Sequence, residues 1–270
     1  MSVPLCDVRR YLRHALAFAD TARAAIRAAV RDGFIATAKP DGSVVTDIDR
    51  RVEDLLRDQI LAEFPGHGVV GEEGGASRPR ADTIWWLDPI DGTSNLVAGI
   101  PTYGTIIALH VGGKPVVGVI DHPALNMRSW AGRGLGLHRS CRWQWPTPAA
   151  GDVPLVLNDR SVFDRSGDAA IFAALTDAHP RARIYNDCFG HTLALGGGVV
   201  VVEFNARPWD LAATRLLVEE GGGIYVDSVS HRSTESSPVQ GRYAVFGPPG
   251  AVAVIHATLL AFTQKEATGR

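Results

Sequence analysis

Two features of the sequence predict an α/β fold built from layers of helices and sheets. Two stretches near the N-terminus repeat apolar residues with helical spacing, and the remainder consists of short apolar runs separated by turn residues. In the second half these runs alternate with helical patterns, which is typical of layered α/β proteins. The 29 glycines follow no fixed period, so they indicate tight turns rather than a fibrous repeat.

The first half is predicted to contain two amphipathic helices followed by strands. The first helix carries an apolar face from Val8 to Val30 and ends at Gly33, and the second carries one from Val52 to Phe64 and ends at a Pro-Gly pair. Glycines between two apolar runs at 105–111 and 115–120 predict a hairpin. The other expected strands are 69–70, 83–87 and a strand pair within 130–137.

The second half is predicted to alternate strands with helices. The expected strands are 155–157, 183–185, 199–204, 224–226 and 244–246, and the expected helices are 169–178, 192–195, 211–220 and 251–264. A stretch rich in Trp, Pro, Gly and Ala at 139–154 separates the halves. We therefore expect an N-terminal α+β domain at 1–140 and a C-terminal α/β domain at 150–270.

Composition excludes several classes of protein. Hydrophobic residues make up 46% of the chain and charged residues 21%, which excludes a disordered protein, and a net charge of −2 offers no electrostatic footprint for nucleic acid or an anionic membrane. No apolar run approaches the roughly 20 residues of a membrane span, and a polar N-terminus argues against a signal peptide. Three scattered cysteines form no disulfide framework. We expect a soluble, cytoplasmic protein without nucleic-acid or membrane partners.

Acidic residues stand at the ends of three predicted elements. Glu72 and Glu73 follow one strand, Asp88 and Asp91 flank a proline at the end of another, and Asp210 begins a helix. Taken singly, each is an ordinary turn or cap residue. Taken together, they can converge on one point.

The segment around Asp88 has the composition of a metal site beside an anion site. Asp88, Asp91 and the carbonyl of Ile90 form a set of hard oxygen ligands that suits Mg²⁺ or Mn²⁺, and the absence of Cys and His disfavours zinc. Gly92-Thr93-Ser94 can open a helical turn whose backbone N–H groups bind a phosphate. A metal next to an anion site is typical of phosphoryl transfer.

Four motifs resemble the signatures of the inositol monophosphatase family, in the same order and with similar separations. They are Gly71-Glu72-Glu73, Trp86-Leu87-Asp88-Pro89-Ile90-Asp91-Gly92-Thr93-Ser94-Asn95-Leu96, Pro208-Trp209-Asp210-Leu211-Ala212-Ala213 and Glu219-Glu220-Gly221-Gly222. The similarity extends from about Tyr11 to Ala257. It implies an α-β-α-β-α sandwich and a Mg²⁺-dependent, lithium-sensitive phosphomonoesterase that acts on a small phosphorylated metabolite, as a homodimer.

The resemblance also implies roles for the acidic residues. Glu72, Asp88 and the Ile90 carbonyl would hold a first metal ion, and Asp88, Asp91 and Asp210 a second. Glu72 would also contribute to a weaker third site with Glu73 nearby. Two or three Mg²⁺ ions are thus expected, with Mn²⁺ as a substitute. The N-terminal domain would carry most of these ligands, and the C-terminal domain Asp210 and the substrate-recognition residues.

The implied mechanism uses a metal-activated water instead of a protein nucleophile. In the family a Thr–Asp pair orients that water. Thr93 matches the threonine and Asp49 matches the aspartate, with Asp47 as the alternative. Glu72 belongs to the same expected catalytic set.

Residues outside the metal motifs bear on the substrate. Asp187 and Phe189 resemble the Gly-Asp-aromatic pattern of histidinol phosphatases, although Asn186 replaces the glycine, and the segment 39–47 is similar to those enzymes as well. Glu203 lies where inositol phosphatases carry an inositol-contacting glutamate. Two acids near the leaving group suit an ammonium or imidazolium substrate better than a neutral polyol. An equal alternative is that Asp187 only caps the following helix.

The sequence therefore predicts a phosphoric monoester hydrolase acting on histidinol phosphate. Gly92, Thr93, Ser94, Asp187 and Glu203 are the expected substrate-binding residues. The alternative within the same class is an inositol-1-phosphate phosphatase or a broader sugar or nucleotide phosphatase. The alternative from a different class is a non-catalytic partner of the transcription or RNA machinery.

Overall fold

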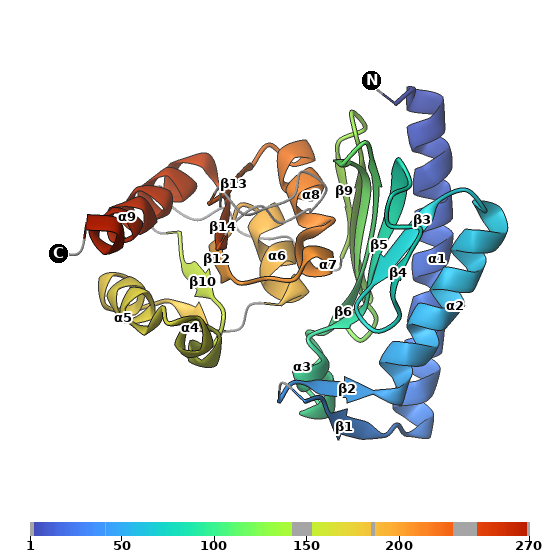
Figure 1. Ribbon diagram of the computed structural model, residues 1–270, viewed down its shortest axis with the longest axis horizontal. Coiled ribbons are helices and arrows are strands. Elements are labelled where there is room, and N and C mark those ends of the chain that lie inside the picture. The colour runs from blue at the N-terminus through green and yellow to red at the C-terminus, as the bar shows by residue number, and fades with distance from the viewer. Residues whose placement is uncertain (1–2, 41, 142–152, 185–186, 229–241, 269–270) are drawn as a thin grey trace.

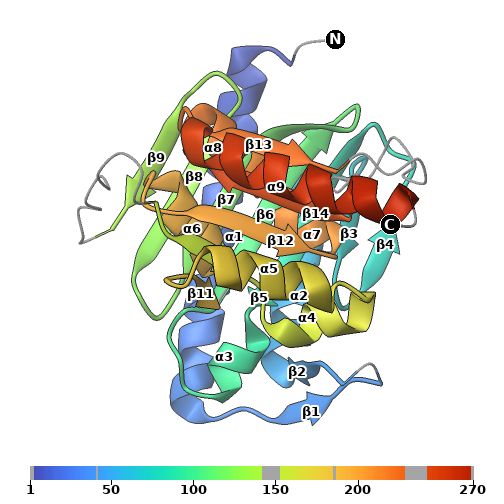
Figure 2. The same cartoon turned by 90° about the vertical axis from the view of Figure 1, so that its left-hand side faces the viewer.

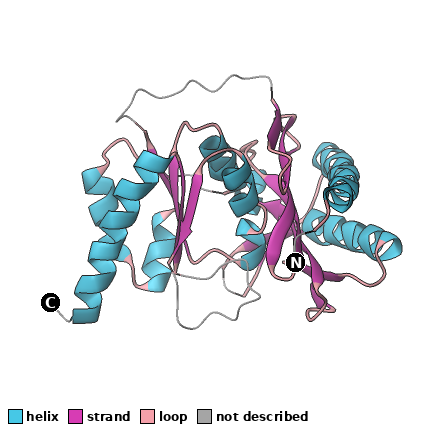
Figure 3. Ribbon diagram, turned by 90° about the horizontal axis from the view of Figure 1, so that it is seen from above, coloured by secondary structure: helices cyan, strands magenta, loops and turns pink. Residues whose placement is uncertain are grey.

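The computed structural model describes residues 3–40, 42–141, 153–184, 187–228 and 242–268 of the 270-residue chain. Its elements stack in the order helix, sheet, helix, sheet, helix, and Figure 3 shows these layers edge-on. The predicted layered α/β sandwich is confirmed. No helix among the described residues combines the length and apolar character needed to cross a bilayer.

Two long helices form the first layer. α1 (Leu5–Asp32) and α2 (Asp47–Glu63) pack on one face of the larger sheet, at the right of Figure 1. α1 buries its apolar face and ends at Gly33, as predicted. α2 begins at Asp47 because the side chain of Thr46 accepts the N–H of Ile48 and that of Asp49 accepts the N–H of Thr46.

The larger sheet has seven strands in the order β4-β3-β5-β6-β7-β8-β9. Its strands are β3 (Gly68–Gly71), β4 (Gly75–Ser77), β5 (Thr83–Asp91), β6 (Gly104–Val111), β7 (Lys114–His122), β8 (Met127–Gly132) and β9 (Leu137–Ser140). β3 and β5 are parallel, and the other neighbours are antiparallel. The predicted hairpin corresponds to β6 and β7, and the predicted strand pair to β8 and β9.

The smaller sheet and its helices form the remaining layers. α6 (Cys188–Leu195), α7 (Pro208–Leu211) and α8 (Thr214–Glu220) lie between the sheets. The strand order is β11-β10-β12-β14-β13. These strands are β10 (Leu155–Leu157), β11 (Arg183–Ile184), β12 (Val200–Phe204), β13 (Ile224–Asp227) and β14 (Tyr243–Gly247). α4 (Arg160–Ser166), α5 (Ala169–Ala178) and α9 (Pro249–Thr268) cover the outer face, and Figure 2 shows α9 lying across this sheet.

Several predicted boundaries differ from the structure, among them the start of the helix expected at 192–195, which begins at Cys188. The helix expected at 211–220 is divided into α7 and α8, and the carbonyl of Ala212 in the break accepts a hydrogen bond from His110 Nε2 at 2.9 Å. The strand expected at 83–87 continues to Asp91, with a register shift between Asp88 and Asp91. That shift arises because Pro89 has no N–H to donate to the ladder.

The two predicted domains each contain one of the sheets. The boundary between them falls at 142–152, outside the described residues, together with Trp143 and Trp145. The division at 1–140 and 150–270 therefore stays a prediction. The cysteines Cys6, Cys141 and Cys188 form no disulfide.

His110 links the larger sheet to the α7–α8 segment and makes stability depend on pH. Its side chain is buried, and burial lowers its pKa to about 4. The unfolded chain binds a proton near the ordinary value of 6.5, so the stabilisation is complete above that pH and is lost as pH falls toward 4. We expect wild type, relative to His110→Gln, to lose about 2–3 kcal/mol of unfolding free energy between about pH 7 and about pH 4.5. Urea denaturation at both pH values measures this, and a pH-independent difference would contradict it.

Candidate active site

β5, an inner strand of the larger sheet, carries two carboxylates at its end. In the ladder between β5 and β6, Asp88 is paired with Ile106 and Asp91 with Gly104, so the chain between them departs from regular pairing. Thr105 Oγ1 donates to the Pro89 carbonyl at 2.8 Å and fixes this irregular segment. The proline turn thereby directs both acids toward the layer of short helices.

Asp210 joins these two carboxylates from the other half of the chain. One oxygen each from Asp88, Asp91 and Asp210 lies within 4.8 Å of the others. The N–H of Arg207 donates to Asp210 Oδ2 at 2.7 Å, which holds the side chain at the start of α7. The N–H of Cys188, at the start of α6, donates to Asp91 Oδ2.

The electrostatics of this cluster fit a divalent cation. Burial is the largest effect that raises the pKa of Asp88, Asp91 and Asp210, and neighbouring carboxylates raise it further. Asp88 is 2% exposed, and its Oδ1 has no hydrogen-bond partner among the described residues. Asp91 and Asp210 are only partly buried, but three carboxylates of like charge at this separation are unfavourable unless a cation binds between them. Their oxygen atoms are the ligands that Mg²⁺ prefers.

Glu72 and Glu73 lie beside the cluster but bind a lysine. Lys39 follows β1 (Ala36–Ala38), which pairs with β2 (Val44–Thr46) at the lower end of Figure 1. Its Nζ donates to Glu72 Oε1 at 2.8 Å and Glu73 Oε1 at 2.5 Å. Burial lowers the pKa of Lys39, but the two carboxylates outweigh burial and raise it. One ammonium group therefore balances part of the negative charge of the two carboxylates.

A buried glutamate shapes the turn that carries Glu72 and Glu73. Glu53 of α2 accepts the N–H of Glu73 at 2.7 Å and the N–H of Gly74 at 2.8 Å. A Cβ on Gly71 would lie 2.2 Å from Glu53 Oε1, so only glycine allows this approach. The Gly-Glu-Glu motif is thus set by a side chain from the first layer.

Replacing Lys39 with methionine tests its balancing role. We expect the metal-free variant to unfold about 2–4 °C below wild type, since two half-buried carboxylates lose a hydrogen-bonded cation. Saturating Mg²⁺ should narrow this gap, because a metal at Glu72 replaces the lost charge. Differential scanning calorimetry with and without Mg²⁺ measures the effect, with Lys114→Met at the exposed start of β7 as the control. An equal gap under both conditions would contradict it.

The structure brings Thr93 and Asp49 together. Thr93 begins α3 (Thr93–Val97), and its Oγ1 lies 2.9 Å from Asp49 Oδ1 and 2.8 Å from the Ile90 carbonyl. Thr46 donates its backbone N–H to Asp49 Oδ2 at 2.8 Å, and burial raises the pKa of Asp49. Asp47, the alternative partner, instead accepts the N–H of Ile35 at 2.8 Å. Of the two aspartates, Asp49 is therefore the one in contact with Thr93.

Asp187 lies against the same loop as Thr93. Its Oδ2 accepts a hydrogen bond from Asn95 Nδ2 at 2.7 Å. It occupies the N-cap position of α6, but its side chain makes no capping hydrogen bond. The capping alternative is therefore wrong for the side chain. Gly92 lies beneath this carboxylate at φ 82°, and a Cβ there would be 3.1 Å from Asp187 Oδ2.

Glu203 is paired with a buried histidine. His191 Nε2 lies 2.5 Å from Glu203 Oε2, and His191 Nδ1 lies 2.9 Å from Thr214 Oγ1. Burial lowers the pKa of His191, but the charge of Glu203, its hydrogen bond and the charge of Asp91 together outweigh burial and raise the pKa. One Glu203 oxygen is thus already bound, and its negative charge is partly balanced.

The predicted site residues thus gather around the β5–α3 loop. Asp88, Asp91 and Asp210 form the cluster, Thr93 contacts Asp49 and Ile90, and Asp187 lies over Gly92. Ser94 is exposed, and Glu72 and Glu73 contact Lys39. No role was predicted from the sequence for Lys39, Asn95 or His191. Asn95 lies within the motif around Asp88, but its partner Asp187 is 92 positions away.

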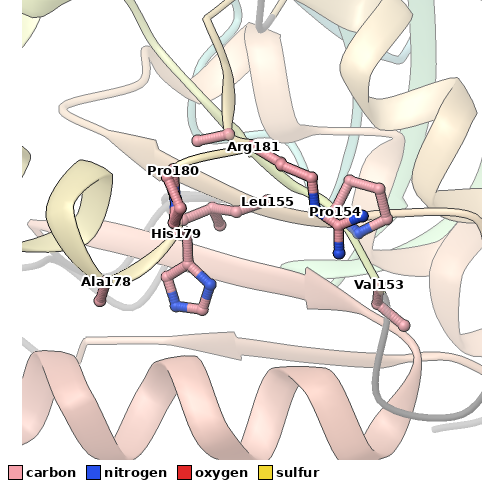
Figure 4. A pocket seen from close by; sticks show the side chains of 8 residues that line it. Val153, Pro154, Leu155, Ala178, His179, Pro180 and Arg181 are labelled. Carbon is pink, nitrogen blue, oxygen red and sulfur yellow. The ribbon is translucent and has the colours of Figure 1, made fainter.

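A cavity of about 230 Å³ lies elsewhere, between the start of β10 and the loop after α5 (Figure 4). None of the predicted site residues lines it. Val153, Leu155, His179 and Arg181 are among its lining residues. It is therefore separate from the acidic cluster.

Comparisons with known proteins give the family to which this fold and acidic cluster belong. The sequence model of the inositol monophosphatase family matches residues 7–245. The chain belongs to this family and is a phosphoric monoester hydrolase.

Individual relatives and a solved structure are similar to this chain over most of its length. The histidinol-phosphatase of Mycobacterium tuberculosis is 39% identical over 220 residues, which span 77% of this chain and 84% of that protein. The Nus factor SuhB of Escherichia coli is 28% identical over 220 residues, 73% of this chain and 76% of that protein. The structure of an inositol monophosphatase from Anabaena superposes with a TM-score of 0.75 at 22% identity, covering 94% of this chain and 97% of that one.

Proposed function

We propose that this protein is a Mg²⁺-dependent histidinol-phosphate phosphatase. The observation that carries the phosphatase assignment is the cluster of Asp88, Asp91 and Asp210, with its unpartnered buried oxygen, next to the Thr93–Asp49 pair. The choice of substrate is supported by the carboxylate of Asp187 and by the similarity to a histidinol-phosphatase. Homodimer formation, lithium inhibition and substitution of Mg²⁺ by Mn²⁺ stay predictions.

The proposed metal ligands are Asp88, Asp91, Asp210, Glu72 and the Ile90 carbonyl, with Glu73 beside a third site. Mg²⁺ held there would supply positive charge for the phosphate oxygens and acidify a water molecule. Lys39 must move away from Glu72 for that carboxylate to serve as a ligand, because its Nζ now binds Glu72 Oε1. The backbone N–H groups at Gly92, Thr93 and Ser94 are proposed to hold the phosphate at the start of α3.

The protein's own groups provide a path for the proton of the attacking water. Thr93 Oγ1 can accept that proton while its own proton passes to Asp49 Oδ1, 2.9 Å away. Burial raises the pKa of Asp49, which makes it a stronger base than an exposed aspartate. The new P–O bond to water then forms as the ester P–O bond breaks, and the alkoxide leaves toward Asp187 and takes up a proton from bulk water.

Asp187 is proposed to recognise the ammonium of the leaving group. It is the better placed of the two substrate acids, since Glu203 already binds His191 through Oε2. A carboxylate at short range from a cation in a half-buried site favours a charged amino alcohol over a neutral polyol. Glu203 would then contact the leaving group through the carboxylate oxygen that does not bind His191.

Phosphate release from a panel of esters tests the substrate. The panel holds histidinol phosphate, inositol 1-phosphate, fructose 1,6-bisphosphate and adenosine 3′,5′-bisphosphate. We expect kcat/KM for histidinol phosphate to exceed the others by about 100-fold, or about 2.7 kcal/mol of transition-state binding. A preference for inositol 1-phosphate would replace this proposal with the inositol-phosphatase alternative.

The non-catalytic alternative is tested by the same panel. Similarity to a Nus factor favours a partner role in transcription, but a chain without catalysis has no physical need for three mutually repelling carboxylates. Absence of phosphate release from every ester, together with RNA polymerase recovered in a pull-down, would support the alternative.

A further inference from the structure

Asn95 connects the catalytic loop to the residue proposed to choose the substrate. It lies in the first turn of α3, and its backbone N–H donates to the Gly92 carbonyl at 2.9 Å. Its Nδ2 lies 2.7 Å from Asp187 Oδ2 and 3.1 Å from Thr102 Oγ1. The two amide hydrogens thus each have an acceptor, which fixes the side-chain orientation. A flipped amide would place its oxygen against the Asp187 carboxylate and is excluded by repulsion.

The chain around Asp187 contacts the catalytic loop at several points. The N–H of Cys188 donates to the proposed metal ligand Asp91, and Asp187 Oδ2 lies over Gly92. The backbone contact places the start of α6, whereas the amide of Asn95 determines where the Asp187 carboxylate points. No capping bond holds that carboxylate to its own helix.

We propose that Asn95 is a positioning residue that holds the Asp187 carboxylate against the catalytic loop. It thereby sets the preference for phosphate esters with a cationic leaving group over those with an uncharged leaving group. This inference rests on the proposed recognition of a cationic leaving group by Asp187. Asn95 itself touches neither the metal ligands' carboxylates nor the Thr93–Asp49 pair through a hydrogen bond among the described residues. Its loss should therefore affect substrate choice and leave bond cleavage intact.

Steady-state kinetics of Asn95→Ala with two substrates test this role. We expect KM for histidinol phosphate to rise about tenfold, as for loss of a hydrogen bond to a charged group, with kcat within about twofold of wild type. For p-nitrophenyl phosphate, which has no cationic group, both constants should stay within about twofold of wild type. Val97→Ala, at an exposed position of the same helix, is the matched control for local changes in α3.

A double-mutant cycle separates positioning from a general structural effect. If Asn95 acts through Asp187, then Asn95→Ala should cause no further loss in an Asp187→Ala background. Equal losses for both substrates, or losses that multiply in the double variant, would overturn the inference while leaving the phosphatase assignment standing.

Binding of the product provides a readout that does not depend on turnover. Calorimetry with histidinol should show about tenfold weaker binding to Asn95→Ala than to wild type. If wild type hydrolyses no ester, the proposed function fails, and this titration still decides whether Asn95 orients Asp187. Equal histidinol affinities for both proteins would overturn the inference.

Discussion

Replacing Asp88 with asparagine is expected to reduce the rate of phosphate release by more than about 100-fold. Substitution of a residue that only supports a metal ligand already lowers metal affinity or activity by about 10–100-fold. Asp88→Asn should also stabilise the metal-free protein. Asp88 is buried among Glu72, Asp91 and Asp210, and these charges together with burial disfavour its ionised form. A neutral side chain of the same shape removes that repulsion. Activity assays and urea denaturation in EDTA measure the two effects.

Asp121 offers a matched control for Asp88. Its side chain is also fully buried, but Arg23 Nε donates to Asp121 Oδ2 at 2.9 Å and Arg128 Nε to Oδ1 at 2.5 Å. We expect Asp121→Asn to lower the unfolding free energy by about 3–5 kcal/mol, since it breaks a buried ion pair. Activity per folded molecule should persist. If Asp88→Asn keeps wild-type turnover, the metal assignment is wrong. If Asp88→Asn is less stable than wild type in EDTA, another group compensates the charge of Asp88.

Replacing Thr93 with valine is expected to lower kcat by about 10²–10⁴-fold with little change in KM. Valine keeps the shape of threonine but removes the Oγ1 that lies between Asp49 and the Ile90 carbonyl. The water would then lose its proton acceptor, while the binding of the phosphate to backbone N–H groups stays intact. Rapid-mixing measurements of phosphate release determine both constants.

Thr93→Ser is the control for this prediction because it retains the hydroxyl. It should keep most of the activity, and Asp49→Asn should resemble Thr93→Val. A Thr93→Val enzyme with wild-type kcat would exclude the proposed proton path and leave only a structural role for the Thr93–Asp49 contact.

The order of elements could be predicted where periodicity was strong. The apolar face of α1 and the glycine hairpin between β6 and β7 are long patterns, and both are present. α4 buries only Phe163 completely, and β1 is exposed throughout, so neither leaves a periodic signal. The break between α7 and α8 depends on His110, whose side chain comes from a strand about 100 residues earlier.

The acids of the candidate site could be found from their motifs, whereas their partners could not. Asp88 and Asp91 lie at the end of one strand, and Asp210 lies in the first turn of one helix. By contrast, Lys39 reaches Glu72 across 33 positions, and His191 meets both Glu203 and Thr214 only after α6, β12 and α8 pack together. Such contacts depend on tertiary packing, which one sequence without aligned relatives does not specify.

The dependence of phosphate release on Mg²⁺ tests the central claim most directly. Histidinol phosphate is incubated with the protein after EDTA treatment, and inorganic phosphate is measured as Mg²⁺ is added back. We predict no release without metal, release that saturates with Mg²⁺, and no recovery for Asp88→Asn at any Mg²⁺ concentration. Equal release with and without metal, or none from any ester of the panel, would contradict the assignment of Asp88, Asp91 and Asp210 as the metal centre of a phosphatase.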